Sequence, residues 1–152
     1  MYVFLPSTVP ALAALLEEGR VEGTPLTAFV ADPGVEGDSE EAEYAAMYAA
    51  AEESLRMLAA DPEAPRRRVV LAAEMPDRII EHRAHQGEGV ARVSVLGAIP
   101  YKKLKSVHVD DVDAAEDVAE AVEDPASEAV EGHELMWFAV QELRYLVEEA
   151  RR

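Results

Sequence analysis

The sequence predicts a single-domain α/β (α+β) sandwich, in which helices cover a mixed β-sheet of about five strands. Short apolar runs rich in β-formers are bounded by glycine and proline, which is typical of strands. Longer stretches repeat apolar residues every three or four positions, which is typical of amphipathic helices. The 152 residues are 49% apolar, which is enough to bury a core within one domain over residues 1–152. The predicted order of elements is β-α-β-α-β-β-β-α-α.

The N-terminal segment predicts a strand, a helix and a second strand. Tyr2–Leu5 is a short apolar run, and Ser7 or Thr8 can cap the helix that follows. The buried face of this helix and the glycine that ends it are Leu12, Leu15, Leu16 and Gly19. Leu26–Ala31 lies between two turn-forming segments and predicts the second strand, which is followed by a loop over Pro33–Gly37.

A long helix is predicted from Asp38 to about Ala60. Asp38 and Glu41 have the spacing of an N-terminal capping pair, and Asp61 followed by proline ends the helix. One face carries Tyr44, Met47, Ala51, Leu55 and Leu58. The adjoining face consists of Ala45, Ala46, Ala49 and Ala50. Because alanine allows close approach, we expect the C-terminal helix to pack on this face.

Three strands and a helix are predicted in the second half of the chain. The strands are Val69–Ala73, Val90–Leu96 and Ser106–Asp110. The segment Met75–Gly89, between the first two, is polar and predicts an irregular connection. Asp111 or Asp113 caps a helix that continues through Val122, before Pro125 breaks it.

The strongest helical pattern lies in Gly132–Arg152. One apolar face recurs at helical spacing and consists of Met136, Ala139, Val140, Leu143, Val147 and Ala150. A second line runs beside it in steps of four and consists of His133, Trp137, Gln141 and Tyr145. These side chains combine apolar bodies with polar ends. The line fits either the edge of the core or the wall of a ligand pocket.

The chain is strongly acidic, with a formal net charge of −17. Twelve acids and no lysine or arginine lie between Lys105 and Arg144. This charge disfavours binding to nucleic acid or to an anionic membrane, since both require a positive surface. The sequence has no cysteine and no apolar run long enough for a membrane span. It predicts a soluble, cytoplasmic protein without a cofactor or a metal.

Carboxylates follow several predicted strands. They are Asp32, Glu74 with Asp77, and Asp110 with Asp111. If the strands are parallel, these side chains converge at one edge of the sheet, where they suit Mg²⁺ or proton transfer. The alternative is that Asp111 caps a helix and the others are loop carboxylates. His82 and His85 are only a weak metal signal, because they lie on a predicted loop.

Basic residues precede two predicted strands. They are Arg66, Arg67 and Arg68 before one strand, and Lys102, Lys103 and Lys105 before another. Parallel strands would bring both groups together as an anion site. The alternative is that these side chains pair with the acidic helices around them.

Three parts of the sequence are distinctive when taken together: YVFLPST, EAEYAAMYAAAEESLRMLAADPEAPRRRVVLAAE, and VHVDD together with EGHELMWFAVQEL. With these stretches the chain resembles a family of actinobacterial proteins of unknown function. The most specific part is a GHEL-x-W-x-x-x-QE pattern in the C-terminal helix. A short Asp32–Asp38 loop and Phe138 in place of tyrosine depart from the family pattern. The resemblance implies the extent of the domain and a bacterial cytosolic setting.

Three functional hypotheses follow from the sequence. The first is a non-catalytic binding or regulatory module that self-associates or binds an unknown protein partner. The second is a small enzyme with a pocket lined by His133, Trp137 and Gln141, in which Glu43 or Glu134 is the acid or base, or in which a hard metal ion binds. The third is an acidic mimic of nucleic acid. The sequence favours the first, because the phosphate-loop, nucleophile-elbow and zinc-helix motifs are missing.

Overall fold

The computed structural model describes residues 1–23, 25–32, 37–87 and 89–151. The strands are β1 (Tyr2–Ser7), β2 (Arg20–Val21), β3 (Leu26–Ala31), β4 (Val69–Glu74), β5 (Ile80–Gly87), β6 (Val90–Val95), β7 (Ile99–Pro100), β8 (Leu104–Val109) and β9 (Met136–Phe138). The α-helices are α1 (Val9–Glu18), α2 (Ser39–Ala60), α3 (Ala115–Glu123) and α4 (Leu143–Ala150). Short 3-10 turns are η1 (Asp77–Ile79), η2 (Tyr101–Lys103), η3 (Val112–Ala114) and η4 (Val140–Glu142). The loop predicted over Pro33–Gly37 lies, through residue 36, outside the described residues.

The main sheet has seven strands in the described part of the chain, in the order β5-β6-β3-β1-β4-β8-β9. Every neighbouring pair is antiparallel. The predicted α+β class is confirmed, whereas a mixed sheet of about five strands is wrong in both strand number and direction. Strands β2 and β7 form a separate two-stranded sheet. No helix in the described ranges combines the length and apolar character that a bilayer crossing requires.

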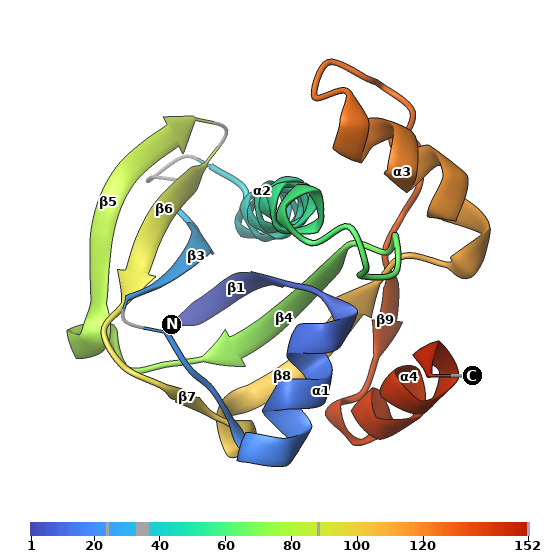
Figure 1. Ribbon diagram of the computed structural model, residues 1–152. Helices are drawn as coiled ribbons and strands as arrows, with labels where there is room; N and C mark the ends of the chain where they lie inside the picture. Colours follow the sequence, from blue (N-terminus) through green and yellow to red (C-terminus); the bar gives the residue numbers. More distant parts are fainter. Residues whose placement is uncertain (24, 33–36, 88, 152) are drawn as a thin grey trace.

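Helices cover both faces of the sheet (Figure 1). On one face, α1 and α4 pack on alternate strand residues such as Val3, Leu71 and Val107. On the other face, the alanines of α2 pack on Phe4, Phe29, Val70, Ala72 and Val90. Helix α3 lies beside α2 and contacts it around Leu58 and Val118. The smooth face of α2 therefore packs against the sheet, and its predicted contact with the C-terminal helix is wrong.

The helix caps predicted by the sequence are present in α1 and α2. Thr8 Oγ1 accepts a hydrogen bond from Ala11 N at 3.3 Å, and Gly19 ends α1 with a φ of 73°. Asp38 Oδ1 accepts from the backbone nitrogens of Glu40 and Glu41 at 2.8 and 3.2 Å. Side-chain acceptors at these positions satisfy N–H groups that have no partner within the helix.

The predicted irregular segment Met75–Gly89 contains strand β5, which pairs with β6 along most of its length. Its residues from Glu81 to Gly87 are exposed, and its register shifts twice. Alternation of apolar and polar residues arises when one face of a strand is buried. Because both faces of this edge strand are exposed, its sequence lacks the periodicity that predicts strands.

The C-terminal helix predicted over Gly132–Arg152 is also wrong in its first half. Gly132 has a φ of 88°, and the chain then extends as β9, with Met136 opposite Val109 of β8. The α-helix begins only at Leu143. Met136 and Phe138 alternate as a strand requires, but Met136, Ala139 and Val140 also fit a helical spacing. Pairing with the free edge of β8 decides between the two patterns.

Candidate functional site

The predicted line of His133, Trp137, Gln141 and Tyr145 does not form a single surface. His133 precedes β9, Trp137 lies on β9, Gln141 lies in η4 and Tyr145 lies on α4. Trp137 is 63% exposed and Tyr145 is 56% exposed. Glu43 is exposed on α2. Of these five residues, only His133 lines the cleft that flanks α2.

This cleft, of about 790 Å³, lies between α2 and the segment over residues 124–134 that follows α3. Helix α2 contributes one wall, with Tyr44, Tyr48, Glu52, Leu55, Arg56 and Ala59. The end of α3 and the following segment contribute the other wall, which includes Val122, Ala126, Val130 and His133. Arg68, at the start of β4, also lines the cleft. The sequence did not predict this wall, because the short segment between the two predicted helices is polar and has no clear periodicity.

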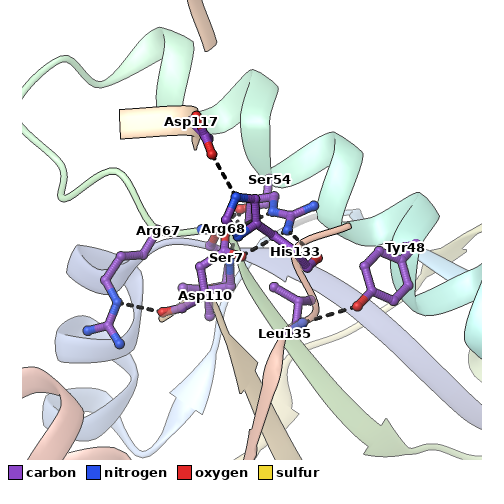
Figure 2. A network of polar contacts seen from close by, with 10 residues as sticks. Ser7, Tyr48, Ser54, Arg67, Arg68, Asp110, Asp117, His133 and Leu135 are labelled. Carbon is purple, nitrogen blue, oxygen red and sulfur yellow. Dashed lines mark hydrogen bonds and ion pairs between the residues drawn. The ribbon is translucent and has the colours of Figure 1, made fainter. Parts of the chain in front are cut away.

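Arg68 forms a buried ion pair with Asp110 beside this cleft (Figure 2). Arg68 Nε and Nη2 donate to the two carboxylate oxygens of Asp110, each at 2.8 Å. Arg68 N donates to the same carboxylate at 2.8 Å, and Arg67 Nε donates to the Asp110 carbonyl at 2.9 Å. Asp110 is fully buried and Arg68 is 4% exposed. The pair fixes the start of β4 to the end of β8.

Arg68 also holds the segment that forms the second wall. Its Nη2 donates to the carbonyl of His133 at 3.1 Å. Its Nη1 has no acceptor among the described residues. Since no fully buried side-chain nitrogen or oxygen in the described ranges lacks a partner, Nη1 keeps its access to solvent. A nearly buried guanidinium therefore has one nitrogen that can donate hydrogen bonds to a ligand in the cleft.

Two further contacts fasten the second wall (Figure 2). His133 Nε2 lies 2.7 Å from Asp117 Oδ2 on α3. The Tyr48 hydroxyl accepts from Leu135 N at 3.1 Å. Burial raises the pKa of the Tyr48 hydroxyl, and the hydrogen bond from Leu135 offsets part of this rise. Tyr48 therefore stays protonated, with its ring centroid 4.7 Å from that of Tyr44.

The antiparallel sheet separates the two predicted basic groups. Arg66, Arg67 and Arg68 precede β4, at the end of the sheet where β8 finishes. Lys102, Lys103 and Lys105 precede or begin β8, at the opposite end. Arg66 Nη1 donates to the carbonyls of Leu58 and Asp61, so it caps the end of α2. The single anion site expected from parallel strands is not formed.

The lysines instead line a smaller cleft, of about 580 Å³, with acidic neighbours. Glu74 and Asp77 are among its lining residues, and Lys105 Nζ lies 3.9 Å from Glu74 Oε2. The predicted convergence of carboxylates is likewise wrong, because Glu74 and Asp110 lie at opposite ends of the antiparallel pair β4 and β8. Within the described ranges, no three His, Asp or Glu side chains are grouped as metal ligands.

A family model described as "Family of unknown function (DUF6912)" matches residues 1–147. The chain belongs to this family. The match includes every strand, both walls of the cleft and most of α4, so the DUF6912 unit contains the whole candidate site. No curated protein and no solved structure matches the chain.

His108, opposite Trp137 in the pairing of β8 with β9, predicts a pH dependence of stability. Burial lowers the pKa of His108 below its usual value, and Ser106 Oγ lies 2.9 Å from its Nε2. The unfolded chain therefore binds a proton first as the pH falls below about 6.5. We expect stability to fall from that pH down to the folded-state pKa of His108. Urea unfolding at pH 7.5 and 5.5 measures this loss.

The matched variants for this prediction are His108→Gln and His82→Gln, the latter in the exposed strand β5. His108→Gln is expected to reduce the loss of stability between the two pH values, whereas His82→Gln is expected to leave it unchanged. An equal loss in wild type and His108→Gln would contradict the assignment.

Proposed function

We propose that the protein is a non-catalytic binding module whose ligand occupies the cleft between α2 and residues 124–134. The observation that carries this proposal is Arg68 Nη1. It belongs to a side chain that is nearly buried and lines the cleft, yet it has no acceptor among the described residues. Binding sites commonly combine apolar walls with a few fixed polar groups. A donor held in this way orients a ligand at small entropic cost.

The walls of the cleft are held in place before any ligand binds. Three contacts tie the second wall to the rest of the fold, through the His133 carbonyl, the His133 ring and Leu135 N. They come from Arg68 just before β4, from α3 and from α2 respectively. Contacts from three separate elements restrict movement of this segment, which supports a preformed site rather than one that folds on binding.

A small enzyme is the second candidate function, and the pairing of His133 with Asp117 is the observation that favours it. A carboxylate at 2.7 Å orients the histidine ring, as a general base requires. Turnover of a bound compound that His133→Gln abolishes without weakening binding would favour this candidate. Trp137 and Gln141, which the sequence placed in the same pocket, do not line the cleft.

A fragment screen followed by ¹H–¹⁵N NMR tests the binding proposal. We expect fragments with apolar bodies and a hydrogen-bond acceptor to shift the amide signals of Tyr48, Leu55 and Val130. Ala126→Trp places a large side chain at the exposed mouth of the cleft and is expected to weaken these fragments at least about tenfold, since a filled pocket excludes its ligand.

Ala98→Trp is the matched control, because Ala98 is exposed and lies outside the cleft. It is expected to leave fragment binding unchanged. Fragments that bind Ala126→Trp as tightly as they bind the wild type, or that shift signals only elsewhere, would exclude the cleft as the binding site.

A further inference from the structure

Given the proposed binding role, we propose that the ligand of the cleft is an extended basic peptide segment of a partner protein. In this complex, a main-chain carbonyl of the peptide accepts from Arg68 Nη1. Lysine or arginine side chains of the peptide reach the carboxylates of Glu128, Glu131 and Glu134 on the second wall.

The charges of the cleft favour a cationic partner. Its lining carboxylates are those of Glu52, Glu128, Glu131 and Glu134. Its basic lining side chains already have acidic partners: Arg56 pairs with Glu53 at 2.5 Å and Glu52 at 3.7 Å, Arg68 pairs with Asp110, and the His133 ring contacts Asp117. Within the described ranges, Glu128, Glu131 and Glu134 have no cationic partner. An anionic ligand would meet this negative surface and the net charge of −17.

The ligand group that accepts a hydrogen bond from Arg68 Nη1 is best a neutral one. The charge of Arg68 is already balanced by the fully buried Asp110, which contacts it through two parallel hydrogen bonds. A second carboxylate or phosphate at Nη1 would leave two anions beside one guanidinium. A peptide carbonyl satisfies the same donor without adding charge.

The length of the cleft fits a peptide better than a single amine. Lining positions on α2 run from Tyr44 to Ala59, which is about 22 Å at a rise of 1.5 Å per residue. An extended chain rises about 3.3 Å per residue, so six or seven residues fill this length. The aliphatic stems of lysine or arginine can pack on Leu55, Val122 and Val130. The face of Tyr44, which is 54% exposed, can accept a cation.

An NMR titration with a capped heptapeptide of alternating lysine and alanine tests this inference. We expect it to shift the amide signals of Tyr48, Leu135 and residues 128–134, together with the side-chain Nε–H signal of Arg68. The triple variant Glu128→Gln, Glu131→Gln, Glu134→Gln is expected to weaken binding about tenfold, since exposed ion pairs contribute modestly and together. Raising the salt concentration from 50 to 300 mM is expected to weaken binding further.

The matched control carries the same change of charge outside the cleft. It is the triple variant Glu17→Gln, Glu18→Gln, Glu116→Gln, three exposed positions that do not line the cleft. We expect it to retain wild-type affinity within about twofold, because these three carboxylates do not line the cleft and exposed charges are screened by salt. Equal weakening in both triple variants would show attraction to overall charge alone and would overturn the inference.

Two further probes distinguish the remaining occupants. Lysine amide, a single residue, is expected to bind at least tenfold more weakly than the heptapeptide; equal affinity would replace the peptide by a small amine. A heptapeptide of alternating glutamate and alanine is expected not to bind, and its binding would overturn the inference. If fragments occupy the cleft and the basic heptapeptide does not, the inference fails while the proposed binding role stands. If neither occupies the cleft, both fail.

Discussion

Replacing Asp110 with asparagine is expected to lower the free energy of unfolding by about 3–5 kcal/mol, because one partner of a buried ion pair is removed. Asp110 accepts two hydrogen bonds from the Arg68 side chain and one from Arg68 N, all at 2.8 Å. Asparagine keeps the size of the side chain but leaves the guanidinium uncompensated. The side-chain NH₂ group of asparagine would also face an N–H donor of Arg68, at a position where a carboxylate oxygen of Asp110 accepts a hydrogen bond. Urea unfolding followed by circular dichroism measures the change.

Two variants separate the ion pair from general effects of charge. Asp113→Asn removes the same charge from an exposed position in η3, and is expected to change stability by less than about 1 kcal/mol. The double variant Arg68→Met, Asp110→Asn removes the orphaned cation. It is expected to be more stable than Asp110→Asn alone, since replacing both ions avoids a buried unpaired charge. An Asp110→Asn protein within about 1 kcal/mol of the wild type would refute the role assigned to this pair.

Replacing Ser54 with alanine is expected to cost about 1–3 kcal/mol, since a buried hydroxyl loses two hydrogen bonds to buried backbone groups. The Ser54 hydroxyl donates to the Ser7 carbonyl at 2.7 Å and accepts from Val69 N at 3.1 Å (Figure 2). Ser54 and Val69 are fully buried, and Ser7 is 4% exposed. One hydroxyl on α2 thus joins the end of β1 to the start of β4. Thermal and urea unfolding measure the loss.

Ser94→Ala is the matched control for this second prediction. Ser94 is also buried, but its hydroxyl accepts only from Nε of Arg83, a side chain that is 44% exposed. Water can replace this bond, so we expect a loss of less than about 1 kcal/mol. Equal losses in Ser54→Ala and Ser94→Ala would mean that the two backbone groups joined by Ser54 find other partners.

The elements that bury one face could be predicted from the sequence. The strands near Tyr2–Leu5, Leu26–Ala31 and Val69–Ala73, and the long helix after Asp38, have the expected places because their apolar periodicity reflects burial. Strands β5 and β9 could not be predicted in this way. β5 is exposed along most of its length and β9 has only three residues, so neither has a clear apolar periodicity. Both strands form because they pair with a neighbouring strand.

The candidate site depended on strand direction, which local sequence does not encode. Antiparallel pairing places Val69 opposite Val109, so the residue before one strand meets the residue after the other. That register alone brings Arg68 to Asp110. Parallel pairing, which the sequence analysis considered, separates them and joins the lysines to the arginines instead. The spacing of Tyr44 and Tyr48 on one helical face was the local signal that could have marked the wall formed by α2.

The central position of β1 has a consequence for synthesis on the ribosome. This strand lies between β3 and β4, and its register joins Tyr2 to Glu74 and Ser7 to Val69. About 60 to 70 further residues are therefore synthesised after β1 before its β4 neighbour is made. Until β4 is made, other chains can contact the apolar side chains of β1 and the backbone N–H and C=O groups that later pair with β4. Since such long-range pairing is slow, chaperones have time to bind the nascent protein at β1 during this interval.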